Sequence, residues 1–189
     1  HPQHRRQRQM CIRDRTATAS ASNKVYNASS AATVTLSLSG FIGSETVTST
    51  NSSTFDNKNV GTGKTVTVNS ITLADGTNGG LAANYSISTG QTTTANVTAK
   101  ALTVSGISAS NKVYDSTTNA TATLSFSGLI GSETINNTNT STFDNKNIGT
   151  GKTVTVNSLT LVDGSNGGLA SNYSLSLIHI SEPTRRNSI

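Results

Sequence analysis

The chain has 189 residues, of which 12% are charged and 4% aromatic, and its formal net charge is +5 at neutral pH. A single cysteine excludes a disulfide framework, and no apolar run approaches the about 18 residues that a membrane-spanning helix needs. A net positive charge ordinarily favours nucleic acid as a partner, but here the charge is unevenly distributed.

All seven arginines lie before residue 16 or after residue 184, whereas seven lysines balance seven acidic residues between residues 16 and 177. The ends, residues 1–15 and 177–189, resemble translated sequencing-adapter sequence, so we interpret them as non-native flanks. No nucleic-acid partner and no membrane insertion are therefore expected. A genuine basic tail for nucleic acid or lipid headgroups is the alternative, and it predicts salt-sensitive binding that disappears when residues 1–15 are removed.

The body between the flanks is a tandem repeat. Residues 54–73 return at residues 142–161 with only two changes, Val60 to Ile148 and Ile71 to Leu159. The shift of 88 positions exceeds the roughly 20 to 50 residues of a solenoid repeat, so each copy is predicted to be a small domain.

The predicted modules are residues 16–100 and residues 101–176. By this division the segment that would form the first strand of module 1 falls in the N-terminal flank. The segment that would form the last strand of module 2 falls in the C-terminal flank. We therefore expect both modules to present an unpaired sheet edge.

Within module 1, apolar and polar residues alternate over residues 32–38, which predicts a strand with one buried face. Further strands are expected at residues 45–50, 65–73 and 92–99, separated by turns rich in Asn, Asp and Gly. No stretch has a helical apolar period. The prediction is an all-β chain of two tandem β-sandwich-like (Ig-like) modules, each with several short strands, with a small barrel-like roll as the alternative.

Along the strand predicted at residues 65–73, the apolar residues change from even-numbered to odd-numbered positions. Val66 and Val68 are even-numbered, whereas Ile71 is odd-numbered. One extra residue would keep all of them on the same face, so a β-bulge is predicted near Asn69–Ser70 and again at Asn157–Ser158.

Gly61–Thr65 resembles the end of a phosphate-binding loop. The first glycine of that loop is replaced by Lys58, and a Thr/Val strand follows where the loop needs a helix. We therefore interpret the segment as a hairpin-type turn.

The body of the sequence also lacks the residues that catalysis or metal binding would require. The body contains no His, Cys or Arg, no paired-acid spacing is evident, and its hydroxyls have no activating base. The Asp-Gly loops at residues 75–78 and 163–166 hold one acid each, whereas calcium takes six to eight oxygens. No enzyme activity, catalytic residue, metal or cofactor is expected.

The loops rich in Asn, Asp and Gly are the remaining candidates for ligand binding. Their polar residues are Asp56, Asn57, Asn59, Asp75 and Asn78, repeated as Asp144, Asn145, Asn147, Asp163 and Asn166. Sugar sites usually stack a ring on an aromatic face, but the chain has no Trp, and Tyr26 and Tyr85 are expected in the core.

Three ordered blocks carry a resemblance to a known family: residues 111–118 (NKVYDSTT), residues 142–149 (TFDNKNIG) and residues 168–173 (GLASNY). On these blocks the chain resembles the YDG-type repeats of large bacterial surface adhesins, found in filamentous-haemagglutinin-like and autotransporter exoproteins. Ser116 stands where the naming motif has glycine. The resemblance implies export to the bacterial cell surface and tandem β domains that form a stalk or an adhesive array, without assigned ligand or catalytic residues.

The first functional hypothesis is therefore a structural stalk or spacer of a secreted or surface-exposed adhesin, whose partners are the neighbouring repeats of the same chain. The alternative is a module that binds a host glycan or surface protein through the Asn/Asp/Gly loops.

Overall fold

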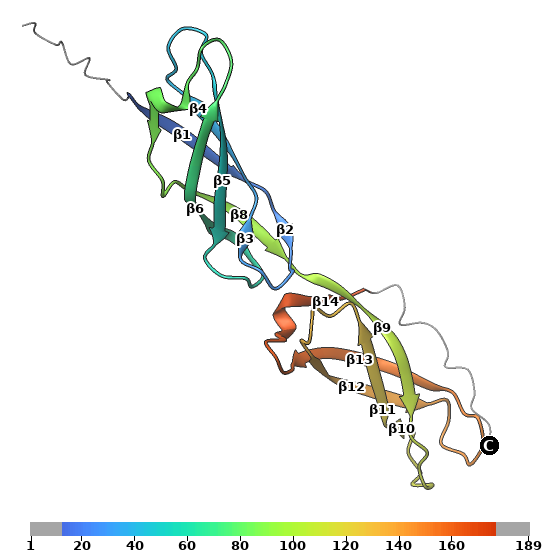
Figure 1. The fold of residues 1–189 in the computed structure, drawn as a ribbon. Helices are drawn as coiled ribbons and strands as arrows, with labels where there is room; N and C mark the ends of the chain where they lie inside the picture. Colours follow the sequence, from blue (N-terminus) through green and yellow to red (C-terminus); the bar gives the residue numbers. More distant parts are fainter. Residues whose placement is uncertain (1–12, 177–189) are drawn as a thin grey trace, which may run out of the picture. The chain divides into compact units, whose positions relative to one another are not determined.

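The computed structural model describes residues 13–176, with side chains from residue 16 onward, and the described chain is all-β apart from two single 3₁₀ turns. It divides into two compact units (Figure 1). Within the described range, unit 1 contains residues 13–24 and 29–97, and unit 2 contains residues 25–28 and 98–176. Unit 2 thus includes four residues that belong to the first sequence repeat.

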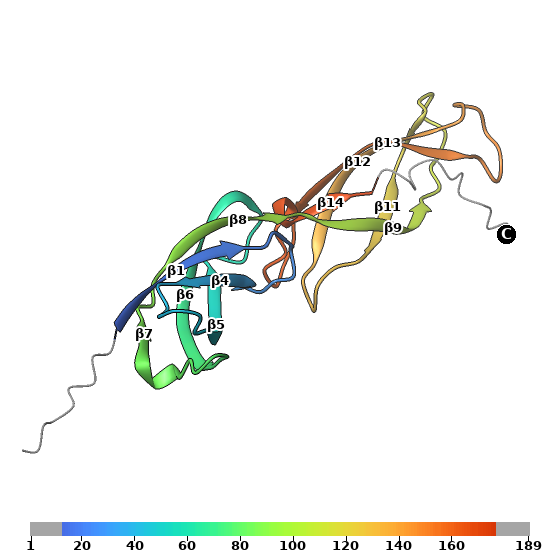
Figure 2. The ribbon, with the colours of Figure 1, turned by 90° about the horizontal axis from the view of Figure 1, so that it is seen from above.

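Unit 1 is built from two sheets, with strand orders β4-β1-β7 and β2-β8-β6-β5-β3 (Figures 1 and 2). The last residues of β2 and β8, Val25 and Thr98, are counted with unit 2. The elements are β1 (Arg13–Ala21), β2 (Lys24–Val25), β3 (Ala31–Ala32), β4 (Val34–Ser39), β5 (Val47–Phe55), β6 (Gly61–Asp75), η1 (Ala82–Asn84), β7 (Tyr85–Ile87) and β8 (Thr92–Thr98).

Unit 2 repeats this arrangement, with sheets ordered β11-β9-β14 and β10-β12-β13. Its elements are β9 (Lys100–Ala109), β10 (Asn119–Ala120), β11 (Ala122–Ser127), β12 (Ile135–Phe143), β13 (Val154–Asp163), η2 (Ala170–Asn172) and β14 (Tyr173–Leu175). The segment that would match β8 lies outside the described residues, as does the expected missing last strand of module 2.

The expectation that module 1 lacks its first strand was wrong. β1 pairs antiparallel with β4 and parallel with β7, just as β9 pairs with β11 and β14. A ladder is made by backbone N–H and C=O groups, so an Arg-Asp-Arg-Thr segment can form a strand that residue-by-residue comparison with module 2 misses. The flank boundary drawn at residue 15 therefore falls inside β1, while the rest of both flanks lies outside the described residues.

The predicted β-bulges are confirmed. In the β5–β6 ladder Ser52 pairs with Ser70 but Ser53 pairs with Val68, so Asn69 is the extra residue. The β12–β13 ladder shifts in the same way, and there Asn157 is the extra residue. The inserted residue lets the strand keep its apolar side chains on one face despite the change of parity.

The core of each unit draws on both of its sheets, as in a β-sandwich. Its buried side chains include Val34, Val47, Phe55, Val66, Val68, Tyr85, Ala95 and Val97 in unit 1, and Tyr26, Leu102, Ala122, Leu124, Ile135, Val154 and Tyr173 in unit 2. The expectation that Tyr26 and Tyr85 are core residues is confirmed.

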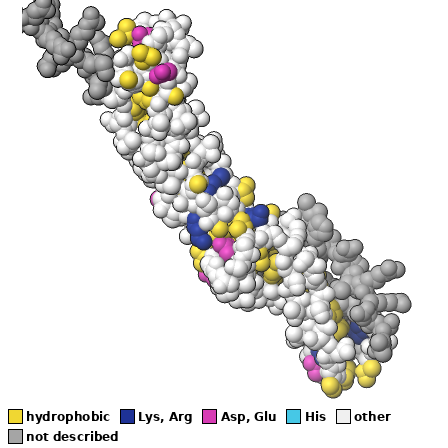
Figure 3. All heavy atoms as spheres, in the orientation of Figure 1, with side chains coloured by type: hydrophobic (Ala, Val, Ile, Leu, Met, Phe, Trp, Pro, Cys, Tyr) yellow, Lys and Arg dark blue, Asp and Glu magenta, His cyan; other side chains and the backbone are white. Residues whose placement is uncertain are grey.

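The exterior is dominated by uncharged polar side chains, and Figure 3 shows few charged atoms on the face it presents. Hydroxyl groups pair across neighbouring strands, with oxygen-to-oxygen distances of 2.7 Å between Ser52 and Ser70 and 2.6 Å between Thr140 and Ser158. Such cross-strand pairs stabilise a sheet without adding charge.

Candidate functional site

The first predicted loop of unit 1 closes around a lysine. Lys64 Nζ lies 2.8 Å from Asp56 Oδ1 and donates to Asn57 Oδ1 at 2.7 Å. Asn57 Oδ1 also accepts the Asn59 backbone N–H at 3.0 Å. The hydrogen bond from Lys64 lowers the pKa of Asp56, and the Lys64 side chain is only 8% exposed. The loop is a compact polar cluster that satisfies its own groups.

Unit 2 reproduces the cluster around Lys152. Its Nζ lies 3.0 Å from Asp144 Oδ1 and 2.5 Å from Asn145 Oδ1, and it donates to the Asn147 carbonyl at 3.0 Å. As in unit 1, the lysine hydrogen bond lowers the pKa of the aspartate.

The second predicted loop of unit 1 uses its polar groups on the backbone. Asp75 Oδ1 accepts the Ala82 N–H at 2.7 Å, and Asn78 Nδ2 donates to the Ser44 carbonyl at 2.9 Å. Asn78 has φ of 55°, a left-handed conformation that Asn tolerates better than most residues. These contacts fix the loop onto the turn before β5.

In unit 2 the same loop is fixed by Asp163, which accepts from Ala170 N–H at 2.7 Å, and by Asn166, which donates to the Ser132 carbonyl at 3.0 Å. The backbones also approach closely here. A Cβ added to Gly164 would lie 2.1 Å from the Thr134 carbonyl oxygen, as it would at Gly76 beside Thr46.

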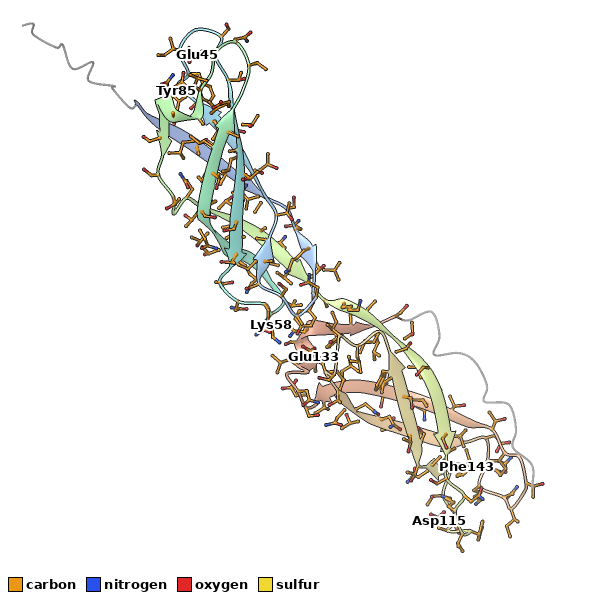
Figure 4. The ribbon with its side chains drawn as sticks, in the orientation of Figure 1. Glu45, Lys58, Tyr85, Asp115, Glu133 and Phe143 are labelled. Carbon is orange, nitrogen blue, oxygen red and sulfur yellow. The ribbon has the colours of Figure 1, made fainter. Side chains whose placement is uncertain are left out.

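The two loops of each unit lie at opposite ends of one hairpin. Val47 pairs with Asp75 at one end of the β5–β6 ladder, and Phe55 pairs with Val66 at the other. Nine strand residues separate these ends, about 25–30 Å, and Figure 4 shows Lys58 far from Glu45 within unit 1. The candidate residues therefore form two separate clusters in each unit instead of one site.

A third cluster, in unit 2, was not predicted from the sequence. Glu133 is 7% exposed, and its carboxylate accepts the Tyr26 hydroxyl at 2.8 Å and the Tyr173 hydroxyl at 2.6 Å. The two rings meet edge to face with centroids 5.5 Å apart. Burial, together with the hydrogen bond to Glu133, raises the pKa of both tyrosines to about 12.

Unit 1 contains the matching acid and tyrosine. The Tyr85 hydroxyl donates to Glu45 Oε2, and Figure 4 shows the two residues together at one end of the unit. Here the ring in edge-to-face contact with Tyr85 is Phe41, at a centroid distance of 5.3 Å. The position of Phe41 is held by Leu129 in unit 2.

These repeated clusters belong to one domain type. The model of the YDG domain matches residues 13–95 and again residues 98–180. The chain belongs to the YDG domain family. The resemblance of the sequence blocks to YDG-type repeats is thereby confirmed, and the chain contains two YDG domains in direct succession. No curated protein and no solved structure matches it.

Residues 13–176 contain no group of three or more His, Cys, Asp or Glu side chains that could hold a metal ion. Among these residues there is also no helix with the length and apolar character needed to cross a membrane.

One sequence signal could have revealed the third cluster of the YDG domain. Glu45 and Glu133 recur at the same place in the repeat, each 40 residues before a tyrosine. An isolated acid in a neutral, hydroxyl-rich chain requires a partner when it is buried, and the tyrosine at a fixed spacing supplies one. No such signal connects Glu133 to Tyr26, which lies 107 residues away.

Proposed function

We propose that this pair of YDG domains is a structural repeat, a stalk or spacer, of a secreted or surface-exposed bacterial adhesin. The observation that supports it best is the immediate succession of two domains of one family, whose family matches are separated only by residues 96 and 97. Short joins and repeated domains suit a spacer, because each added domain lengthens the chain between the adhesive region and the cell.

The polar clusters support the same proposal. The groups that a ligand would use at the loop ends instead bond to their own unit, as with Lys64 between Asp56 and Asn57 and with Asp75 on the Ala82 backbone. A neutral exterior of paired hydroxyls favours low affinity for charged partners. In this proposal the domains have no catalytic role, bind neither nucleic acid nor cofactor, do not insert into membranes, and act at the cell surface.

The experiment displays a domain of known adhesion on a bacterial surface, joined to its anchor by one or several copies of this two-domain chain. A Gly/Ser linker of equal length replaces the chain in the matched control. Adhesion of encapsulated cells to ligand-coated beads should rise with the number of copies and exceed the linker control. Equal adhesion with the linker would contradict a stalk role.

A glycan array with the purified chain tests the competing binding role. No specific binding is expected. A hit that is lost on Asp56→Ala or Asp75→Ala would show that the loops bind ligand and would replace the proposal.

A further inference from the structure

The motif Asn-Lys-Val-Tyr occurs twice, at residues 23–26 and 111–114, in two different environments. Tyr26 is 1% exposed, whereas Tyr114 is 53% exposed and Val113 beside it is 89% exposed. The valine is exposed in both copies, since Val25 is 54% exposed, so the difference lies in the tyrosine. A large exposed apolar group such as the Tyr114 ring often marks a place where a partner binds.

The difference follows from where Tyr26 packs. Residues 25–28 belong to the second compact unit, where the Tyr26 hydroxyl reaches Glu133 and its ring meets Tyr173. The backbone N–H of Tyr26 also donates to the Thr98 carbonyl at 2.8 Å. Unit 2 is therefore completed by a segment that the preceding sequence repeat supplies.

In the second repeat, side-chain contacts hold the turn beside the exposed Val113–Tyr114 segment, which we call the donor segment. Lys112 Nζ lies 2.7 Å from Asp115 Oδ1 and donates to the Thr117 carbonyl at 3.0 Å. These contacts hold the backbone of the turn that follows Tyr114, which reduces the conformational entropy that the segment loses on binding.

Unit 1 carries a surface that matches the one on which Tyr26 packs in unit 2, and we call it the acceptor surface. Beside the Glu45–Tyr85 pair, Ile42 is 52% exposed and Leu81 is 51% exposed. In unit 2 the residues at these two positions, Ile130 and Leu169, are only partly exposed. Unit 1 thus shows apolar surface around the carboxylate that corresponds to Glu133.

Donor and acceptor lie at opposite ends of a YDG unit. In unit 2, Figure 4 shows Asp115, next to the donor segment, at the end away from Glu133. A contact between two different patches on repeated modules is heterologous, and such contacts propagate in one direction instead of closing as a two-fold dimer.

We propose that the surface formed by Ile42, Glu45 and Leu81, beside the buried Tyr85, accepts the Val-Tyr segment of another YDG domain, and that Val113–Tyr114 is the donor for the acceptor surface of a further one. The tyrosine hydroxyl donates to the carboxylate and the ring covers the apolar rim, as Tyr26 does on Glu133 and Tyr173. The proposal concerns how YDG domains join, and it stands whether or not they serve as a stalk.

The test uses the full 189-residue chain and two variants at exposed positions, so that neither disturbs a core. Tyr114→Ala removes the donor, and Leu81→Asp places a charge on the acceptor rim. Neighbouring modules in one chain meet at an effective concentration of about 1 mM, so self-association is measured by sedimentation equilibrium up to about that concentration.

The natural chain should form dimers and longer species, and each variant alone should associate at least about tenfold more weakly. A mixture of the two variants is the decisive sample. The Leu81→Asp chain keeps an intact donor and the Tyr114→Ala chain an intact acceptor, so the mixture should form heterodimers and stop there. Glu45→Ala, checked for folding by hydrogen exchange, should weaken association like Leu81→Asp.

A natural chain that stays monomeric at about 1 mM, or variants that associate as the natural chain does, would overturn the proposal. So would a mixture that forms no heterodimer, because that result indicates a symmetric contact or none at these surfaces. Phe41→Leu gives the acceptor the residue found at position 129 of unit 2. It should bind no less tightly than the natural chain, and weaker binding would show that the acceptor has been placed wrongly.

Discussion

Replacing Tyr26 by Phe should destabilise unit 2 and leave unit 1 largely unaffected, although residue 26 lies within the first sequence repeat. The change removes only the hydroxyl that donates to the buried Glu133 at 2.8 Å and keeps the ring on Tyr173. A hydrogen bond to a charged group contributes about 1.5–3 kcal/mol, and a loss of about 2 kcal/mol is expected because Tyr173 still donates to the same carboxylate.

The thermal consequence is large for a domain of this size. At about 4–8 °C per kcal/mol, the melting temperature of unit 2 should fall by about 8–16 °C. Tyr26→Ala removes the ring as well, and the loss should reach about 3–5 kcal/mol.

Hydrogen exchange read by mass spectrometry separates the two units, because peptides from β12 and β13 report on unit 2 and peptides from β5 and β6 on unit 1. Tyr114→Phe is the matched control, since the same motif is exposed there, and its effect should stay within about 0.5 kcal/mol. Equal losses for Tyr26→Phe and Tyr114→Phe, or faster exchange mainly in β5 and β6, would refute the assignment of Tyr26 to unit 2.

Three further predictions concern single groups. The two tyrosines on Glu133 have a pKa raised from 10.0 to about 12. Their contribution to the stability of unit 2 is therefore complete below pH 10 and is lost as the pH rises through about 12. Denaturation of the chain across this pH range measures the loss, and a free energy of unfolding that does not change with pH would contradict the raised pKa values. Gly164→Ala should destabilise unit 2 by about 3 kcal/mol, because its Cβ would lie 2.1 Å from the Thr134 carbonyl oxygen. The control Gly106→Ala, whose nearest atom would lie at 3.9 Å, should change the free energy of unfolding by under about 1 kcal/mol. Equal melting curves for the two variants would contradict this prediction. Hydrogen bonds from its lysine and threonine neighbours lower the pKa of Asp115 to about 2, and an NMR titration of its carboxyl should give that midpoint and not the ordinary 3.8.

Features governed by neighbouring residues could be predicted from the sequence. The bulges at Asn69 and Asn157 follow from the parity of a few apolar residues, and parity is a local property of a strand. The failed phosphate-loop match also followed from local facts, and β6 is a strand at that place.

Features that depend on distant partners could not be predicted. Residues 23–26 and 111–114 are identical, so no local rule could bury one tyrosine and expose the other. Tyr26 is buried because Glu133, 107 residues later, receives it. The first strand was missed for a related reason, because backbone pairing tolerates residues that differ from those of the second repeat.

Because residues 25–28 belong to unit 2, the boundaries of the folded unit do not coincide with the boundaries of the sequence repeat. Recombination between copies can cross over anywhere in the repeat, since both copies carry the tyrosine of the Asn-Lys-Val-Tyr motif and a glutamate–tyrosine pair. In the proposed arrangement, gain or loss of whole repeats leaves each interior domain complete, so the number of domains can vary without any compensating mutation. A domain cut out at the sequence boundary, by contrast, would lose its tyrosine and leave a buried acid with one donor fewer.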